Sequence, residues 1–215
     1  MDAYLFDLDG TLLDSFEDIA RSANYARQAL GLAPRPEQEI YGFVGEGALR
    51  LLERTMGPEN ADLVEKALAL WRDHYARHCL EHTKPFPGIP EALVRLPGAR
   101  AVVTNKPGPA ARKLVEALGL GALVSPVIGG GDVPSRKPDP EGCRLALSQM
   151  TGVERVVYIG DSTIDAQTAL NGGYAFVGVL WGKAGRAELE ALGATHFAQR
   201  VEDLPEVCAR ALDKG

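Results

Sequence analysis

The chain is poor in cysteine, and the few cysteines it has lie far apart. Cys79, Cys143 and Cys208 are the only three in 215 residues, a spacing that suits neither a metal site nor a disulfide framework and fits a reducing compartment. Lys and Arg form no block and the net charge is −6, so nothing indicates a nucleic-acid partner. No apolar run approaches the ~18 residues needed to cross a membrane, and the first residues do not resemble a targeting segment. We therefore expect a cytoplasmic protein with no nucleic-acid or membrane partner.

The composition is otherwise that of an ordinary globular protein. Hydrophobic residues make up 46% of the chain, a typical share for a soluble domain. A chain of this length can bury about two-thirds or more of its unfolded surface without cross-links. We expect one large domain, or one domain that carries a smaller insert.

The most informative stretch is residues 3–11, Ala-Tyr-Leu-Phe-Asp-Leu-Asp-Gly-Thr. Its four apolar residues predict a strand buried on both faces. Asp7 and Asp9 would then lie on the same side, because side chains alternate along a strand, and Gly10 allows a sharp end. Two acids so close repel each other, and a cation or a held proton would relieve that repulsion. The alternative is a pair of solvated turn formers after an edge strand, against which the apolar run argues.

Residues 15–84 predict helices only. Ser15 is expected to cap the first helix, with Asp18 three positions on in a capping-box-like place. Residues 37–82 continue at helical spacing, interrupted at Gly57-Pro58. Proline and glycine crowd together at residues 84–88, which is typical of a linker or hinge. We therefore expect an all-helical insert, residues 15–84, in a core made of residues 1–14 and 85–215.

Strands alternate with helices beyond this hinge. The alternation predicts a doubly wound, mostly parallel α/β sheet, whose ligand site lies beyond the carboxyl ends of the strands. The expected strands are 99–104, 123–128, 155–159, 175–179 and 195–198. The expected helices are 89–96, 109–118, 139–150 with Asp139 as its cap, 162–170, 188–192 and 203–212.

Three further groups of polar residues fall at strand ends or in the loops that follow them. They are Thr104-Asn105-Lys106, Arg136-Lys137-Pro138 and Gly160-Asp161 through Asp165. Each has an ordinary explanation by itself: a turn, a solvated loop lysine, or a helix cap followed by a surface acid. Together with Asp7 and Asp9 they fall at one edge of one predicted sheet, which favours a shared site.

These motifs resemble those of the haloacid dehalogenase-like hydrolases. The run from Asp7 to Ser15, Asp-Leu-Asp-Gly-Thr-Leu-Leu-Asp-Ser, is similar to the first motif of the family's phosphatases. Thr104, Lys137 and the Gly160 to Asp165 group are similar to its second, third and fourth motifs. The resemblance covers essentially the whole chain and implies a Rossmann-like core with a small helical cap. The stretches around residues 103–107, 129–133 and 137–140 most resemble the phosphoglycolate phosphatase branch.

The resemblance implies a role for each acid. Asp7 would attack phosphorus and form an aspartyl-phosphate. Asp9 would give a proton to the leaving alcohol and later take one from water. Mg²⁺ would be held by the Asp7 carboxylate, the Asp9 backbone carbonyl and the Asp161 carboxylate. Asp165, outside these ligands, would orient either a metal-bound water or Lys137.

The remaining predicted groups bind the phosphoryl oxygens. Lys137 would neutralise them and the nucleophile as a compact charge, while the Thr104 hydroxyl and the Asn105 backbone N–H would donate hydrogen bonds to the same oxygens. In the insert, the glycine-rich loop at residues 42–47 is either an anion-binding loop or an ordinary turn. Gly45 and Arg50 are our candidates for contacting the rest of the substrate.

His74, His78 and His82 recur every four residues and are expected to lie on one side of a helix. This spacing is compatible with a metal-binding face, but a polar flank near the helix's negative end is favoured, because zinc sites usually need further ligands.

The function that these residues favour is a magnesium-dependent phosphatase of a small phosphorylated metabolite, foremost 2-phosphoglycolate, which gives glycolate and phosphate. A sugar phosphomutase, a pyrophosphatase or an idle phosphate-binding module are the alternatives. Asp9 argues against dehalogenase chemistry, which needs no acid for its leaving group. The active protein would be a monomer or a homodimer.

Overall fold

The computed structural model describes residues 1–213 and contains a six-stranded, entirely parallel sheet. Its spatial order is that of a doubly wound fold, in which the chain runs outward from β1 first to one edge and then to the other. The predicted fold class is confirmed. Across the sheet the strands are β5 (Val127–Gly130), β4 (Ala99–Pro107), β1 (Asp2–Phe6), β6 (Arg155–Gly160), β7 (Ala175–Val179) and β8 (His196–Ala198).

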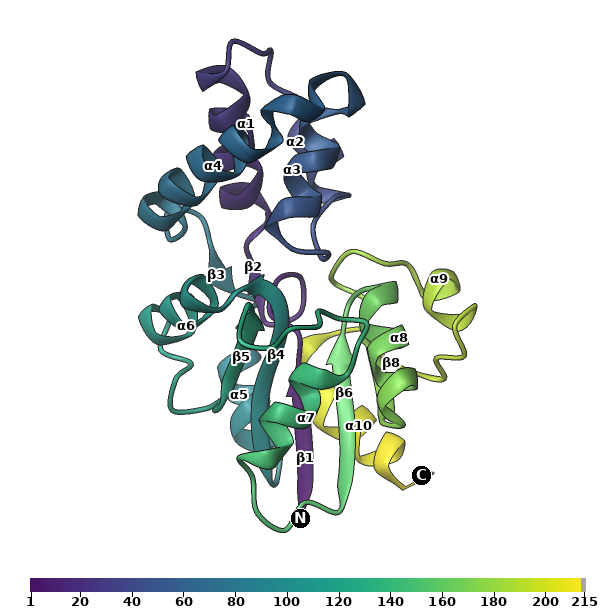
Figure 1. Ribbon diagram of the computed structural model, residues 1–215. Coiled ribbons are helices and arrows are strands. Elements are labelled where there is room, and N and C mark those ends of the chain that lie inside the picture. The colour runs from purple at the N-terminus through teal and green to yellow at the C-terminus, as the bar shows by residue number, and fades with distance from the viewer. Residues whose placement is uncertain (214–215) are drawn as a thin grey trace.

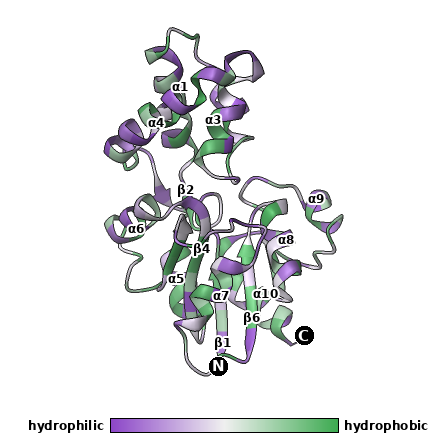
Figure 2. Cartoon of the chain, viewed as in Figure 1, coloured by the Kyte–Doolittle hydropathy of each residue, from purple (hydrophilic) through white to green (hydrophobic). Residues whose placement is uncertain are grey.

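Alternation along the central strands divides the core into two layers. Tyr4 and Phe6 of β1 pack in one cluster, whereas Leu5 packs in the other, as side-chain alternation requires. The first layer holds α5 (Ile89–Arg95), α6 (Gly108–Ala117) and α10 (Leu204–Leu212), and the second holds α7 (Glu141–Ser148) and α8 (Thr163–Gly172). A short helix, α9 (Arg186–Glu190), contacts α8. Figure 2 shows the apolar residues gathered where the sheet meets its helices.

The helical lobe, residues 16–78, stands at one end of the sheet (Figure 1). It contains α1 (Phe16–Ala29), α2 (Glu37–Tyr41), α3 (Ala48–Met56), the 3₁₀ turn η1 (Pro58–Leu63) and α4 (Val64–His78). Helices α1 and α4 pack along each other around buried apolar side chains such as Ala23 and Trp71. The chain enters and leaves the lobe through β2 (Leu13–Asp14) and β3 (Lys84–Pro85), which pair antiparallel.

Several element boundaries differ from the prediction for local reasons. The long helical run of residues 37–82 is broken at the 42–47 loop, where Gly45 and Gly47 have φ of 122° and 89°, and α4 ends at His78, before His82. Strand β5 begins at Val127, because the amides of Leu123 and Val124 bond back to Leu120 in a turn.

Two predicted caps were also wrong. Ser15 precedes α1 but makes no side-chain cap bond, because its hydroxyl donates to Asp9 instead. Helix α7 begins at Glu141, and Asp139 accepts from the Glu141 amide just before it. Within residues 1–213, no helix is both long and apolar enough to span a bilayer.

Candidate active site

Two acids meet where β1 and β6 lie side by side at the centre of the sheet. Asp7 directly follows β1 and donates its amide to Ile159 O, and Asp161 directly follows β6. The connections from these two strands run to opposite sides of the sheet, which leaves a crevice at their carboxyl ends. Asp165, on α8, completes the group: one carboxylate oxygen from each of the three acids lies within 4.8 Å of the others.

The close approach depends on Gly10. It has φ of 86°, and a Cβ at this position would collide with the Asp161 carboxylate. Asp161 accepts hydrogen bonds from Thr11 Oγ1 at 2.9 Å and from the Lys183 amide at 2.8 Å. The turn after β1 therefore both allows the second acid to approach and helps to hold it.

Burial and mutual repulsion dominate the electrostatics of this cluster. Burial raises the pKa of Asp7 to about 6, although the nearby Lys137 opposes the shift. Burial, followed by the charges of Asp165 and Asp7, raises the pKa of Asp161 to about 8. Asp7 Oδ1 lies 2.8 Å from Lys137 Nζ but accepts no aligned hydrogen bond. The cluster is buried, offers only oxygen ligands, and carries more negative charge than Lys137 neutralises. A hard divalent cation prefers such a set of ligands.

Lys137 ties the cluster together. Its ammonium contacts Asp7 Oδ1, Asp165 Oδ1 at 2.7 Å and Tyr158 Oη at 3.0 Å. Asp165 also accepts from Ser162 in a capping box at the start of α8. Asp165 was predicted to orient either a metal-bound water or Lys137, and in the structure it contacts Lys137. Tyr158 was not predicted as a site residue, because nothing in the sequence distinguishes it from a core tyrosine of β6.

The end of β4 brings three consecutive residues to the same edge. Thr104 lines the pocket. The Asn105 side chain donates to Gly45 O at 3.0 Å and to Lys137 O at 3.1 Å, and accepts from the Lys137 amide at 2.9 Å. Lys106 Nζ lies 2.9 Å and 3.0 Å from the two carboxylate oxygens of Asp9. We predicted a role for the Asn105 backbone, but not that its side chain joins the lobe to the Lys137 loop.

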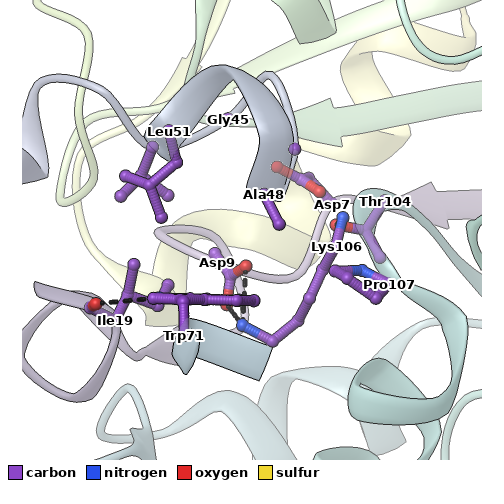
Figure 3. Close-up of a pocket in the computed structure, with 12 residues that line it drawn as sticks. Asp7, Asp9, Ile19, Gly45, Ala48, Leu51, Trp71, Thr104, Lys106 and Pro107 are labelled. Atoms are coloured by element: carbon purple, nitrogen blue, oxygen red, sulfur yellow. Dashed lines mark hydrogen bonds and ion pairs between the residues drawn. The ribbon is translucent and has the colours of Figure 1, made fainter. Parts of the chain in front are cut away.

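A pocket lies between these strand ends and the lobe (Figure 3). Its volume is about 30 Å³, which is room for about two waters. The sheet side contributes Asp7, Asp9, Thr104, Lys106 and Pro107, and the lobe side contributes Ile19, Val44, Gly45, Gly47, Ala48, Leu51 and Trp71.

Gly45 and Arg50 are separated in the structure. Gly45 lines the pocket, whereas the Arg50 side chain is 62% exposed, pairs with Glu53 at 2.7 Å and borders a different hollow on the lobe. Arg50 is therefore outside the group of side chains that surround Asp7 and Asp9 in this structure.

The three histidines do not share one helix face. His74 and His78 stack on each other on α4, whereas His82 lies beyond the helix, where its Nδ1 is 2.8 Å from Asp18 Oδ1. The favoured interpretation, a polar flank, describes His74 and His78; His82 instead belongs to the junction at the base of the lobe.

The fold and these acids at the β1/β6 edge define a haloacid dehalogenase-like hydrolase. The sequence model of that family, "Haloacid dehalogenase-like hydrolase", matches residues 4–179, and the chain belongs to the family. Its curated relatives include phosphoglycolate phosphatases from Caulobacter vibrioides and Neisseria meningitidis serogroup A. The first is 36% identical over 96% of this chain and 90% of the relative. The second is 32% identical over 95% of this chain and 91% of the relative.

Solved structures agree with this assignment. A candidate phosphoglycolate phosphatase from Lactobacillus delbrueckii subsp. bulgaricus superposes with a TM-score of 0.88 at 32% identity, covering 95% of this chain and 96% of its own. A haloacid dehalogenase-like hydrolase candidate from Bacteroides fragilis gives 0.85 at 28% identity, covering 94% and 98%. Both therefore share nearly the full length of the chain, the helical lobe included.

Proposed function

We propose that this protein is a magnesium-dependent phosphatase that hydrolyses 2-phosphoglycolate to glycolate and phosphate through an aspartyl-phosphate. The observation that carries the proposal is the position of Asp7, a buried carboxylate in contact with Lys137 and grouped with Asp161 and Asp165. The curated relatives, named phosphoglycolate phosphatases, supply the substrate.

The residues divide the reaction into two displacements. Asp7 attacks phosphorus, the bond to the bridging oxygen breaks, and that oxygen takes a proton from Asp9. Asp9 then takes a proton from water as the water attacks the aspartyl-phosphate, which releases phosphate and regenerates the Asp7 carboxylate. Lys137 neutralises the nucleophile and the phosphoryl oxygens. The Thr104 hydroxyl and the Asn105 backbone N–H donate hydrogen bonds to those oxygens.

The acid cluster fits Mg²⁺. The carboxylates of Asp7 and Asp161 and the backbone carbonyl of Asp9 would hold the ion, and Asp165 would act through Lys137. When bound, Mg²⁺ supplies positive charge that offsets the repulsion between the attacking carboxylate and the phosphomonoester.

We further propose that the chain divides into a catalytic core and a cap. Residues 1–14 and 85–215 form the catalytic core, and residues 15–84 form a cap that closes the pocket and excludes water during the first displacement. With room for about two waters, the pocket admits any phosphomonoester only after the cap moves. A small metabolite requires the least movement. The site is made by one chain, which suits a monomer or a homodimer, and the scarcity of cysteine supports a cytoplasmic location.

The test is a panel of phosphomonoesters with Mg²⁺ or with EDTA. It includes 2-phosphoglycolate, a sugar phosphate and pyrophosphate, assayed with the wild type, with Asp7→Asn, and with Asp62→Asn as an exposed control with the same change. We expect 2-phosphoglycolate to give the highest kcat/KM, EDTA to abolish turnover, and Asp7→Asn to lower kcat by at least about 10³-fold. Full activity in Asp7→Asn would refute the assignment of Asp7 as the nucleophile. A higher kcat/KM for another compound of the panel would refute 2-phosphoglycolate as the substrate.

A further inference from the structure

Lys106 occupies a place in the pocket that the mechanism above does not use. Its side chain is 2% exposed, and its ammonium faces both carboxylate oxygens of Asp9 and lies 4.6 Å from the ring centroid of Tyr75 on α4. Figure 3 shows Lys106 and Asp9 meeting inside the pocket, beside Trp71. A buried ammonium costs desolvation free energy, so a paired lysine at this position calls for an explanation.

Lys106 is a basic side chain within the pocket that could also contact a second anionic group of a substrate. Among the described residues that line the pocket it is the one cation, and the lobe wall is formed largely by apolar side chains such as Ala48 and Leu51. Lys137 is already shared among Asp7, Asp165 and Tyr158. The lobe arginines Arg50 and Arg54 pair with lobe glutamates, and Arg136 approaches the pocket at Gly47, away from Asp9.

Tyr75 supplies a second, independent observation. It is 1% exposed, and its hydroxyl has no well-aligned hydrogen-bond partner, although Lys106 lies close enough to interact with it. Burial, above all, raises the pKa of Tyr75, and both Lys106 and Asp9 act on it electrostatically, which places the hydroxyl beside that ion pair. A poorly paired buried hydroxyl is costly. Tyr75 lies next to Lys106 but does not itself line the pocket, so a ligand oxygen would reach the hydroxyl by way of Lys106.

The spacing within the substrate matches the spacing within the site. In 2-phosphoglycolate, one carbon separates the bridging oxygen from the carboxylate. The cation that binds the carboxylate must therefore lie directly beside the acid that protonates the bridging oxygen, and Lys106 lies 2.9 Å from Asp9.

Resting on the proposed function, we propose that Lys106 and Tyr75 form the subsite for the carboxylate of the leaving group. The incoming carboxylate takes over part of the pairing that Lys106 gives to Asp9. An Asp9 oxygen is thereby freed to face the bridging oxygen, so recognition of the carboxylate and alignment of the acid occur in one step. A phosphomonoester of similar size that lacks the carboxylate gains neither.

The test compares 2-phosphoglycolate with 2-hydroxyethyl phosphate, which replaces the carboxylate with a neutral alcohol. The readout is the ratio of the two kcat/KM values, because Lys106→Met also removes a partner of Asp9 and lowers both rates. We expect Lys106→Met to reduce the ratio by about 100-fold, Lys106→Arg to restore part of it, and Tyr75→Phe to reduce it by about 10-fold. Lys66→Met, at an exposed position, is the matched control and should leave the ratio unchanged.

The outcomes separate this proposal from the one on which it rests. If the wild type does not hydrolyse 2-phosphoglycolate, the proposed function is wrong. If the wild type hydrolyses it, but Lys106→Met and Tyr75→Phe leave the ratio at the wild-type value, the carboxylate subsite alone is refuted. Binding of 2-phosphoglycolate to the Asp7→Asn variants with and without Lys106→Met, measured by calorimetry, gives the same decision without turnover.

Discussion

Three carboxylates and one ammonium meet at the ends of β1 and β6, so the charges of the site do not balance. Lys137 contacts Asp7 and Asp165, while Asp161 is held by neutral donors, Thr11 and the Lys183 amide. Burial, together with this imbalance, raises the pKa values of Asp7 and Asp161, so the folded protein favours the protonated form of each. A divalent cation bound there would remove that preference.

This imbalance predicts how stability depends on pH. With pKa values raised to about 6 for Asp7 and about 8 for Asp161, the folded state binds more protons than the unfolded state between about pH 4 and pH 8. The contribution of these groups to stability is thus greatest at low pH and is lost as pH rises through those values. Mg²⁺ should therefore raise Tm by several degrees at pH 8.5 and by little at pH 5.5.

Thermal melts of the wild type and Asp161→Asn at both pH values, with MgCl₂ or EDTA, check this expectation. Asp161→Asn removes the acid with the higher pKa, so its metal-free stability should fall less between pH 5.5 and pH 8.5. An equal gain from Mg²⁺ at both pH values would contradict the assignment of the ion to this cluster.

At the residue scale, the sequence indicated which side chains converge but not what each one touches. Asp7 and Asp161 could be placed together because each follows a strand of one parallel sheet, and Lys137 because it lies in the loop after a third strand. The structure brings the three together. The Asn105 side chain and Lys106 could not be assigned, because their partners, Gly45 and Asp9, depend on how the lobe and the β1 turn sit over β4. The catalytic roles stay predictions.

At the scale of elements, one buried acid of α1 makes several contacts at the junction between lobe and sheet. Asp18, with its side chain 1% exposed, accepts from the amides of His82 and Thr83, from Thr83 Oγ1 at 2.7 Å, and lies 2.8 Å from His82 Nδ1. Burial alone would raise the pKa of Asp18, but these donors outweigh it and the pKa is lowered. The start of α1 is thus tied to the chain just before β3.

Replacing this acid should weaken the junction. Asp18→Ala leaves buried donors at residues 82–83 unpaired, and we expect the free energy of unfolding to fall by about 2–3 kcal/mol. Asp73→Ala, which removes an exposed acid paired with Arg77, should change it by less than about 0.5 kcal/mol. Urea unfolding followed by circular dichroism measures both, and equal small effects would show that β2 and β3 hold the junction without Asp18.

Elements were predictable where one local signal decided them. The strand at residues 175–179 has the predicted bounds, because its apolar run is flanked by glycine-rich turns. The run of residues 37–82 was predicted to be interrupted at Gly57-Pro58, and the glycines of residues 42–47 were predicted to form a loop or turn. The positive φ of Gly45 and Gly47 breaks the helix at that stretch as well. Ser15 had the sequence of a cap, and its hydroxyl was taken by the tertiary partner Asp9.

At the scale of the whole molecule, the lobe rests on the core beside the pocket. Lys183 Nζ donates to Val44 O at 2.6 Å, while its own amide donates to Asp161. Asn105 likewise contacts Gly45 O and the Lys137 loop. The loop that closes the pocket is therefore held by two core residues that also touch the acid cluster or its lysine, which couples the position of the lobe to the geometry of the site.

A substitution of Lys183 can separate the two contacts, because its side chain binds Val44 of the lobe and its backbone amide binds Asp161. Lys183→Met removes the bond to Val44 but keeps the amide on Asp161, so we expect kcat/KM to fall about fivefold, the equivalent of one hydrogen bond, with the Mg²⁺ concentration for half-maximal activity unchanged. Lys113 also reaches the lobe, donating to Ala76 O at 2.6 Å from an exposed position on α6, so Lys113→Met is the matched control for a contact away from the pocket. A large rise in the Mg²⁺ requirement of Lys183→Met would mean that the Lys183 side chain also orders Asp161. Equal losses of kcat/KM in Lys183→Met and Lys113→Met would mean that the whole contact between lobe and core, rather than the lobe's loop over the pocket, sets the position of the lobe.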